Sequence, residues 1–331
     1  MVKSSAMHCP GLAELPPPPA GRTGWPWTET YQPARSSIAE WPRLSIVTPS
    51  LNQGAFLEET IRSILLQSYP DLEYFVIDGG STDGSVDIIR KYEPWLTFWE
   101  SVPDRGQPHA INKGLARTTG DLLAYLCSDD VYRPGVFYRV VQALMDNPEN
   151  RWLGGACLLV DETRDSVDIL VPQLPDLPEK WLLKPFGFPY CFPQPGVFFQ
   201  RDLVESAGLF LEDFQYAFDF EYFVRLLFSA QRPILLNEIL AMYRVHAASK
   251  TGSNQAAFDR DVLAIAESYL PRASPPVRAV LTTNRCWRVA EANGPRAARR
   301  ALRQALVHDP WLARSRPVWG ALRRWYGLGG A

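Results

Sequence analysis

Two adjacent aspartates, Asp129 and Asp130, follow closely on an apolar run at residues 122–126. Neighbouring carboxylates repel each other, so a chain that keeps both at the edge of a core needs something to offset their charge. Hard divalent cations bind carboxylate oxygen, and Mg²⁺ is often held by one or two carboxylates together with the phosphates of a substrate. The pair therefore fits a metal–phosphate site, while a cap for the helix after Pro134, or a turn that faces water, explains the same residues.

A third carboxylate, Asp78, ends the apolar residues 72–77 and is followed by Gly79 and Gly80. Two glycines allow a ligand to approach the backbone closely before the next helix begins. An acid at this point could accept hydrogen bonds from a nucleoside base or a ribose, although the GxGxxG dinucleotide pattern is absent from the sequence. A glycine turn closed by the Asp78 side chain is the structural alternative.

A fourth carboxylate, Asp219, stands near the start of a helix predicted in "FQYAFDFEYFVRLLF". Helical spacing places five apolar side chains on one buried stripe: Phe220, Phe223, Val224, Leu227 and Phe228. The same spacing pairs Glu221 with Arg225 as an ion pair. Asp219 lies on the opposite flank, where it is either an N-cap or a carboxylate that takes up a proton in catalysis.

Four further polar side chains could approach a phosphate or a metal: Arg105, Gln107, Lys113 and His246. His246 follows a predicted strand in the segment "YRVHAASKT". A lone histidine or a single basic residue is more often an ordinary core or surface residue than part of a site. These four therefore need support from their surroundings.

Strands and helices must alternate to bring these carboxylates together. Apolar patterning predicts strands at residues 44–50, 72–80, 96–101 and 122–126, and helices at 54–69, 82–92 and 107–118. This order is typical of a parallel α/β sheet with right-handed crossovers, in which ligands bind beyond the carboxyl ends of the strands. Asp78 and the Asp129–Asp130 pair stand at two such ends. Residues 135–252 are predicted to form mixed strands and helices.

Composition narrows the classes of protein. The 331 residues are 46% hydrophobic and 21% charged, which is enough apolar material for one large or two moderate globular domains. A net charge of −2 gives no overall attraction to nucleic acid. No run approaches about 18 apolar residues, so no membrane-spanning helix is predicted. Five scattered cysteines without CxxC spacing favour a cytoplasmic location.

The chain divides into three regions by composition. Residues 1–41 contain four consecutive prolines, Pro16 to Pro19, and are predicted to be a poorly ordered tail. Residues 42–252 carry all of the candidate site. Residues 253–331 hold 13 arginines against five acids, a net charge of +8, whereas the preceding 252 residues carry −10. This last region is expected to form basic helices that either cap the domain or touch an anionic membrane surface, at the inner face of the membrane.

Two long segments resemble a known family. The residues "LSIVTPSLNQGAFLEETIRSILLQSYPDLEYFVIDGGSTDGSVDIIRKY", followed by "PDRGQPHAINKGLARTTGDLLAYLCSDD", closely resemble the inverting family 2 glycosyltransferases with the GT-A fold. The resemblance covers residues 43–251 and implies a GT-A domain over residues 42–252. It implies a nucleotide-binding, mostly parallel sheet flanked by helices, a mixed acceptor-side half and a C-terminal helical extension.

The resemblance also implies cofactors and residue roles. The donor would be a nucleoside-diphosphate sugar, with UDP favoured, and the cofactor a divalent cation, Mg²⁺ or Mn²⁺. The implied metal contacts are Asp130 and, as a late ligand to the metal or diphosphate, His246. Asp219 matches the general base. The implied donor contacts are Pro49, Asn52, Asp78, Arg105, Gln107 and Asp129, the last near the ribose or a metal-bound water.

Two departures from the family pattern refine the expectation. Many members carry two adjacent acids where this chain has Asp78 and Gly79, so its contacts with the nucleoside are expected to differ. The QxxRW signature of processive polymerases is absent from the sequence, which favours transfer of a single sugar to an acceptor hydroxyl of a glycan, polysaccharide or glycolipid precursor. Two alternatives stay open: a catalytically silent nucleotide-sugar binding module, and a glycoside hydrolase with two carboxylates flanking a sugar bond.

Overall fold

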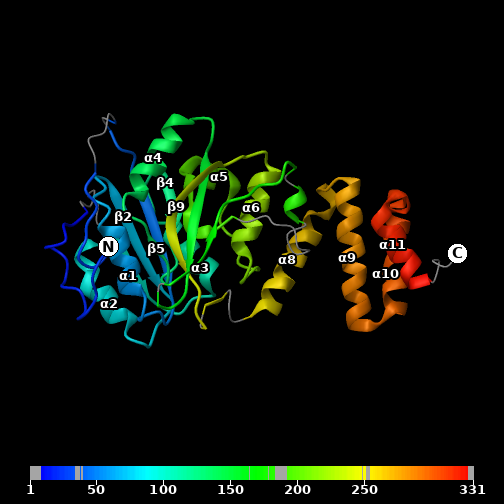
Figure 1. Ribbon diagram of the computed structural model, residues 1–331, viewed down its shortest axis with the longest axis horizontal. Coiled ribbons are helices and arrows are strands. Elements are labelled where there is room, and N and C mark those ends of the chain that lie inside the picture. Colours follow the sequence, from blue (N-terminus) through cyan, green and yellow to red (C-terminus); the bar gives the residue numbers. More distant parts are fainter. Residues whose placement is uncertain are drawn as a thin grey trace. The chain divides into compact units, whose positions relative to one another are not determined.

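The computed structural model describes residues 9–33, 38, 40–163, 165–177, 179–182, 192–247, 249–250 and 254–326. The chain forms two compact units (Figure 1). The first unit comprises Met1–Gln173 and Cys191–Gln255, and the second comprises Leu174–Tyr190 and Ala256–Ala331. The candidate site residues of the sequence all belong to the first unit.

The first unit is built on a nine-stranded sheet with the order β3-β2-β1-β4-β8-β6-β9-β5, and β7 pairs with β6. Its first four strands are parallel: β1 (Leu44–Ser50), β2 (Leu72–Asp78), β3 (Phe98–Ser101) and β4 (Leu122–Tyr125). Every residue of β1, β2 and β4 is buried, as expected for strands covered on both faces. The mostly parallel α/β sheet predicted from the sequence is confirmed.

Three crossover helices cover the two faces of these strands: α1 (Leu57–Leu65), α2 (Ser85–Tyr92) and α3 (Gln107–Leu115). Side chains alternate between faces along a strand. Ile46 and Tyr74 pack in one core cluster with the apolar face of α1. On the other face a Cβ atom at Gly114 of α3 would lie 2.4 Å from Val47, so only glycine permits this approach of helix to strand.

The remaining strands make the sheet mixed. The segment from residue 131 to residue 244 contains β5 (Val131–Tyr132), α4 (Val136–Asp146), β6 (Trp152–Val160), β7 (Ser166–Leu170), β8 (Val197–Gln200), α5 (Arg201–Ala207), α6 (Phe218–Phe228) and β9 (Ile234–Arg244). Strand β8 runs antiparallel to both β4 and β6, and β9 runs parallel to β6 but antiparallel to β5. The mixed second half expected from the sequence is therefore present.

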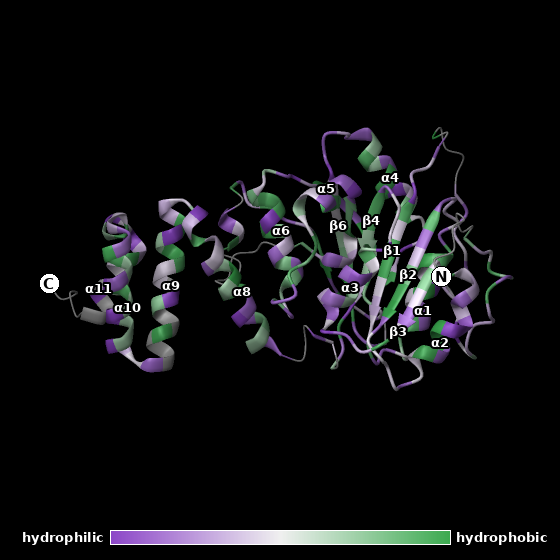
Figure 2. Cartoon of the chain, turned by 180° about the vertical axis from the view of Figure 1, so that it is seen from behind, coloured by the Kyte–Doolittle hydropathy of each residue, from purple (hydrophilic) through white to green (hydrophobic). Residues whose placement is uncertain are grey.

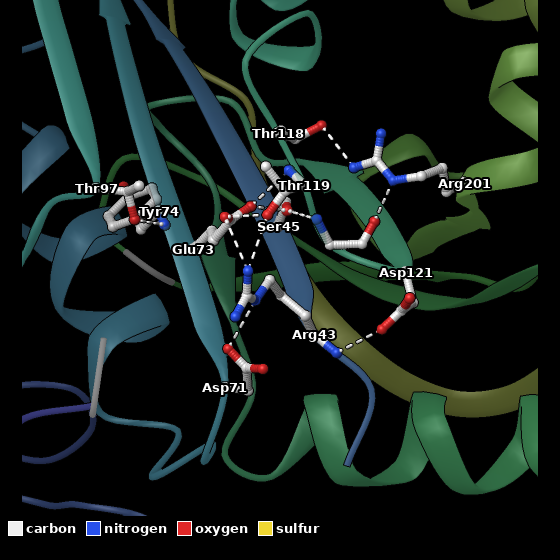
Figure 3. A network of polar contacts seen from close by, with 11 residues as sticks. Arg43, Ser45, Asp71, Glu73, Tyr74, Thr97, Thr118, Thr119, Asp121 and Arg201 are labelled. Atoms are coloured by element: carbon white, nitrogen blue, oxygen red, sulfur yellow. Dashed lines mark hydrogen bonds and ion pairs between the residues drawn. The ribbon is translucent and has the colours of Figure 1, made fainter. Parts of the chain in front are cut away.

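A polar network ties the amino ends of the parallel strands together (Figure 3). At its centre the carboxylate of Glu73 in β2 accepts hydrogen bonds from the Ser45 hydroxyl in β1, at 2.7 Å, and from the Thr119 hydroxyl and amide before β4, at 2.5 and 2.8 Å. Arg43 adds a positive charge 3.7 Å from Glu73. The network leaves the carboxyl ends of the same strands to carry other chemistry.

The N-terminal segment differs from the poorly ordered tail that its prolines favoured. Trp25 and Trp27 are buried in the first unit, and the Trp25 indole donates to the Tyr132 carbonyl at 2.8 Å. The buried Arg62 guanidinium donates to the carbonyls of Pro16, Pro26 and Trp27 at 2.8–3.0 Å. Two tryptophans and one arginine thus fix residues 9–33, whereas residues 1–8, 34–37 and 39 lie outside the described part of the chain.

The second unit is helical. Its described helices after the first unit are α8 (Gln255–Tyr269), α9 (Pro275–Asn293), α10 (Pro295–His308) and α11 (Arg316–Tyr326). Small and aliphatic side chains form the core between α9, α10 and α11, among them Ala279, Ala298, Leu302 and Val318. Hydrophilic residues interrupt the hydrophobic ones along α10 (Figure 2), as expected for an amphipathic helix. Among the described helices, none has the length and apolar content needed to cross a bilayer.

Candidate active site

The aspartate pair lies on a tight turn between β4 and β5. The Asp130 amide donates to the Cys127 carbonyl at 3.1 Å, which closes the turn. Asp130 is 1% exposed, and its carboxylate oxygen Oδ1 accepts a hydrogen bond from the Arg244 amide at 2.9 Å. The Asp129 side chain is 16% exposed and points towards His246, whose Nε2 lies 3.1 Å from Asp129 Oδ2. The structure therefore brings together three of the residues predicted from the sequence.

Arg244 at the end of β9 holds this turn in place. Its Nε donates to the Asp129 carbonyl at 2.9 Å, and its guanidinium forms a buried ion pair with Glu59 of α1 at 3.0 Å. Thr60 of α1 donates its hydroxyl to the Asp130 carbonyl at 2.7 Å. The Phe56 ring contacts both Arg244 and His246, with its centroid 4.8 Å from the guanidinium and 4.7 Å from the imidazole centroid. Helix α1 and β9 together fix the orientation of the carboxylates.

The electrostatics of the turn fit a bound cation. Burial, and then the neighbouring charge of Asp129, raise the pKa of Asp130 well above its ordinary value, although the hydrogen bond from Arg244 opposes this. One ligand atom from each of Cys127, Asp129 and Asp130 lies within 4.8 Å of the others. A divalent cation would offset the cost of keeping a buried carboxylate ionised, so the two carboxylates suit a hard metal that binds oxygen, whereas burial keeps the Cys127 thiol protonated by raising its pKa.

The Asp78 carboxylate organises the loop after β2. It accepts hydrogen bonds from the Gly80 and Ser81 amides at 3.0 and 2.8 Å, and from the hydroxyls of Ser81 and Ser101 at 2.5 and 2.7 Å. The positive φ of 89° at Gly80 permits this turn. Asp78 is fully buried. Four donors therefore hold this carboxylate, and its direct effect is to shape the loop.

The loop after β1 is tied to the loop after β2. Pro49 is buried in β1 beside Ile77 of β2. Asn52 has a positive φ of 53°, a conformation that asparagine tolerates better than most residues. Its amide donates to the Ser81 hydroxyl at 2.7 Å, and its side-chain oxygen accepts from the Thr82 amide at 2.9 Å. The two predicted donor-binding loops thus form one structure.

Two predicted donor contacts, one just before α3 and one at its first residue, behave differently. Gln107 reaches the aspartate turn, because its Nε2 lies 3.0 Å from Cys127 Sγ. Arg105 instead donates through Nε and a terminal nitrogen to Glu212 at 2.9 and 2.7 Å, and its side chain is 69% exposed. Lys113 pairs with Glu100 at 2.5 Å. Gln107 joins the turn, whereas Arg105 connects its loop to the segment before α6.

Asp219 lies in the first turn of α6, and its Oδ1 accepts a hydrogen bond from the Phe220 amide at 2.7 Å. Burial and then the charge of Asp219 raise the pKa of Tyr125, the last residue of β4. The Phe218 ring packs against the Tyr125 ring with centroids 6.1 Å apart. The predicted ion pair between Glu221 and Arg225 is confirmed. Asp219 therefore stands close to the carboxyl end of β4, on a different element from the aspartate pair.

A separate cavity of about 520 Å³ lies near the opposite, amino end of β4. Its lining includes Asp121, Leu122, Arg201, Asp202 and Glu205. None of the candidate site residues lines this cavity. The convergent carboxylates supply the groups that a reaction needs, so they mark the candidate active site.

Comparisons with known proteins fit this geometry. Residues 45–156 match the sequence model described as Glycosyl transferase family 2. An uncharacterized glycosyltransferase of Mycobacterium tuberculosis (strain ATCC 25618 / H37Rv) is 33% identical over 188 residues, which cover 56% of this chain and 68% of that protein. The chain belongs to glycosyltransferase family 2. TuaG of Bacillus subtilis (strain 168), described as a putative teichuronic acid biosynthesis glycosyltransferase, is 34% identical over 115 residues, 33% of this chain and 45% of TuaG.

Solved structures share the fold of this family 2 glycosyltransferase. Residues 1–349 of S. aureus TarS in complex with UDP-GlcNAc match with a TM-score of 0.57 and 16% identity, over 72% of this chain and 71% of that one. The mannosyltransferase PcManGT of Pyrobaculum calidifontis, in complex with GDP-Man and Mn²⁺, matches with a TM-score of 0.54 and 21% identity, over 91% and 84%. The fold is therefore the GT-A type predicted from the sequence.

Several residues of this glycosyltransferase site were not predicted from the sequence. Arg244 and Glu59 fix the aspartate turn from β9 and α1, and Glu212 forms an ion pair with Arg105. Arg244 stands two residues before His246, within the segment singled out for the histidine, so the signal lay in that stretch. Glu59 and Glu212 carried no such signal, because their partners lie 185 and 107 residues away.

Proposed function

We propose that this family 2 glycosyltransferase moves one sugar from a nucleoside-diphosphate sugar to an acceptor hydroxyl, with inversion at the anomeric carbon. The observation that carries the proposal is the division of carboxylates between two elements. Asp129 and Asp130 lie together on the turn after β4, and Asp219 lies apart from them on α6. The Asp129–Asp130 pair can therefore hold a cation while Asp219 accepts a proton.

Asp130 and Asp129 would hold a divalent cation, Mg²⁺ or Mn²⁺, with His246 beside them. A bound cation supplies positive charge to the diphosphate, where negative charge develops as the anomeric bond breaks. Arg244 and Thr60 keep the turn rigid, so the two carboxylates face the donor without rearrangement. PcManGT was solved with Mn²⁺, which supports a metal-assisted reaction in this fold.

Asp219 would accept the proton of the acceptor hydroxyl. Its Oδ1 accepts the Phe220 amide hydrogen, which orients the carboxylate at the start of α6. Attack from the face opposite the leaving diphosphate inverts the anomeric carbon and needs a single base. Glu221 is a poorer candidate because its buried carboxylate forms an ion pair with Arg225.

The donor nucleoside would bind at the loops after β1, β2 and β3. Asp78 and Asn52 shape these loops, Pro49 supports them from β1, and Gln107 connects them to the aspartate turn. Arg105 would serve the donor by fixing its loop to Glu212. We favour a UDP-sugar, as TarS was solved with UDP-GlcNAc, and a glycan, polysaccharide or lipid-linked acceptor, as TuaG is assigned to teichuronic acid biosynthesis.

We further propose that the protein acts in the cytoplasm, in peripheral contact with the inner face of the membrane. Residues 253–331 carry a net charge of +8, which favours an anionic lipid surface. Exposed apolar side chains lie among the arginines of the second unit, at Val307 and Trp319. Nucleic acid is not proposed as a partner, because the whole chain has a net charge of −2.

The test is a thermal stabilisation screen of the full chain with UDP-, GDP- and dTDP-sugars, with Mn²⁺, with Mg²⁺ or with EDTA. We expect a UDP-sugar to raise the melting temperature only when a cation is present, and slow hydrolysis, in which water takes the sugar, to release UDP in the absence of an acceptor. Stabilisation without turnover towards any acceptor would favour a silent binding module. Hydrolysis of a simple glycoside without any nucleotide binding would favour a glycoside hydrolase and overturn the proposal.

A further inference from the structure

A fifth acid, Asp104, lies against the loop that follows β2. A Cβ atom built on Gly79 would come within 2.9 Å of Asp104 Oδ2 and 3.4 Å of Asp104 Cγ. Gly79 has no unusual φ, so its backbone would accept any residue, but a side chain at this position would have to displace the Asp104 carboxylate. The carboxylate of Asp104, from the loop after β3, therefore occupies the space beside Asp78 that a side chain at position 79 would fill.

The two carboxylates differ in what they can still bind. Asp78 is buried and accepts four hydrogen bonds from its own loop and from Ser101. Asp104 is half-buried, and its Oδ1 accepts the Gly106 amide hydrogen at 2.7 Å. No donor among the described residues reaches Asp104 Oδ2. This oxygen is thus the acceptor that remains available at the carboxyl ends of β2 and β3.

Two exposed apolar residues lie near the same place. Leu51, directly after β1, is 54% exposed, and its Cδ1 lies 3.4 Å from the Cβ position of Gly79. Val102, directly after β3, is 43% exposed, and its amide donates to the Asp78 carbonyl at 3.0 Å. Exposed aliphatic side chains beside a fixed carboxylate suit a flat, mostly apolar ring that carries an N–H group at its edge.

We propose that Asp104 is the residue that selects the nucleobase of the donor, by accepting the imide N3–H of uracil on Oδ2. The inference rests on the proposed function and adds a specificity-determining residue to the donor site. Leu51 and Val102 contact the face of the base, while Gly79 leaves the room that the Asp104 carboxylate needs. Asp78 does not contact the base and instead positions the loop after β2.

The chemistry of the base edges explains the choice. Uracil presents one donor, N3–H, between two carbonyl oxygens. Guanine presents two donors, N1–H and N2–H, which a carboxylate reads best with both oxygens, but Oδ1 of Asp104 is already taken by Gly106. Cytosine presents the unprotonated N3, whose lone pair faces the carboxylate unfavourably, and its donor on this edge, the N4 amino group, lies beside the position of N3–H and not at it. One available carboxylate oxygen therefore favours uracil over guanine and cytosine, and thymine, which presents the same N3–H, is compared through the dTDP-sugars of the screen.

The decisive variant is Asp104→Asn. The Gly106 amide still needs an acceptor, so the asparagine oxygen takes the place of Oδ1 and the NH₂ group turns towards the base. A donor at this position repels N3–H of uracil and pairs with N3 of cytosine. We expect UDP binding in the presence of Mn²⁺ to weaken about tenfold or more, and the ratio of UDP to CDP affinity to fall by at least as much.

Two further measurements separate base reading from a structural role. N3-methyl-UDP lacks the hydrogen that Asp104 would accept, so the wild-type chain should bind it about tenfold more weakly than UDP, and Asp104→Ala should bind the two ligands equally. Gly79→Ala keeps every charge but moves the Asp104 carboxylate, and should also weaken the binding of UDP. Asp87→Asn, an exposed acid in α2 paired with Arg90, is the control for loss of one charge.

The possible results are distinct. If the wild-type chain bound no nucleoside diphosphate with any cation, the proposed function itself would fail. If it bound UDP, but Asp104→Asn left the UDP to CDP ratio unchanged and N3-methyl-UDP bound as well as UDP, the inference about Asp104 alone would be wrong. Circular dichroism and the melting temperature of each variant show whether it folds, and N3-methyl-UDP with the wild-type chain tests the proposal without any variant.

Discussion

Asp130 carries an electrostatic cost that its own surroundings only partly offset. The carboxylate is buried, Asp129 is its neighbour in sequence, and the only protein donor shown to reach its side chain among the described residues is the Arg244 amide. The Arg244 guanidinium bonds instead to the Asp129 carbonyl and to Glu59. A group kept ionised under these conditions lowers stability unless a cation binds, which is typical of a site selected for function over stability.

The variant Asp130→Asn separates these two effects. It keeps an acceptor for the Arg244 amide but removes the buried charge, so the metal-free melting temperature should stay the same or rise. Mn²⁺-dependent binding of UDP should weaken about 100-fold or more, because a carboxylate ligand is lost. Calorimetric titration with Mn²⁺ and UDP measures the second effect. Metal-dependent binding at the wild-type strength would show that Asp130 does not hold the cation.

A second variant, Asp219→Asn, tests the base. The donor should bind as in the wild-type chain, since Asp219 lies on α6 and outside the aspartate turn. The kcat should fall by roughly 10²–10⁴, the usual contribution of a positioned general base. Steady-state release of UDP measures kcat, and a separate titration measures binding of the donor. The matched comparison is Glu221→Gln, which should mainly lower stability because Glu221 pairs with Arg225. Near-normal turnover of Asp219→Asn would make Glu221 the first suspect.

Local spacing predicted some of these residues and missed others for a physical reason. The Glu221–Arg225 pair follows from one turn of a helix, and Asp78 and Asp129–Asp130 follow from the ends of parallel strands. The contact between Asp129 and His246 joins residues 117 positions apart. No local rule encodes such a distance, and for His246 only the family resemblance indicated a place near the metal or diphosphate. The Arg105–Glu212 pair had no such guide.

At the scale of elements, the two ends of the parallel strands have separate tasks. The carboxyl ends carry the proposed chemistry, and the amino ends are joined by the network around Glu73 (Figure 3). The N-terminal segment adds a third restraint, because Trp25, Trp27 and the carbonyls around Arg62 secure it to the domain. The proline content predicted a poorly ordered tail there. Composition could not show that Trp25 and Trp27 would be buried against the domain.

Glu73→Gln should test the stabilising task. Burial opposes ionisation of Glu73, but hydrogen bonds from Ser45 and Thr119 and the charge of Arg43 outweigh it and hold the pKa below the ordinary value of 4.5. A carboxyl whose pKa is lower in the folded state stabilises the fold above its unfolded pKa, and this contribution is lost as the pH falls through the folded pKa. We expect the variant to be about 1–3 kcal/mol less stable at neutral pH.

Urea denaturation from acidic to neutral pH measures this difference. The difference in free energy of unfolding between the wild-type chain and Glu73→Gln should be largest at neutral pH and should shrink below about pH 4.5. Glu149→Gln, at an exposed position before β6, is the control and should track the wild-type chain at every pH. A gap that stayed constant down to low pH would mean that the charge of Glu73 contributes nothing.

At the scale of the whole molecule, charge is unequally divided along the chain, with −10 on residues 1–252 and +8 on residues 253–331. In the second unit, Arg296, Arg300, Arg303 and Val307 recur on one face of α10 at helical spacing, and all are exposed. On α11, Trp319 is 47% exposed and shares a face with the exposed Arg316 and Arg323. Basic side chains that alternate with exposed apolar ones suit an anionic bilayer surface.

The double variant Arg296→Glu and Arg300→Glu tests this surface in the full chain. Each arginine near an anionic membrane contributes about 1 kcal/mol, so losing two should weaken binding to phosphatidylglycerol-containing vesicles roughly tenfold or more. Co-sedimentation with such vesicles, and with vesicles of phosphatidylcholine alone, measures the effect. Binding of the wild-type chain should fall as salt is raised, because added ions screen the attraction.

A matched pair of exposed arginines in the first unit, Arg90→Glu and Arg139→Glu, makes the same change of charge elsewhere and should leave vesicle binding nearly unaltered. Equal loss in both double variants would mean that net charge alone drives binding. If the wild-type chain failed to bind anionic vesicles at low salt, the arginines of α10 would be a solvated surface, and the second unit would be a helical cap. UDP release by both variants should match the wild-type chain, because none of these arginines belongs to the donor site or to the proposed base.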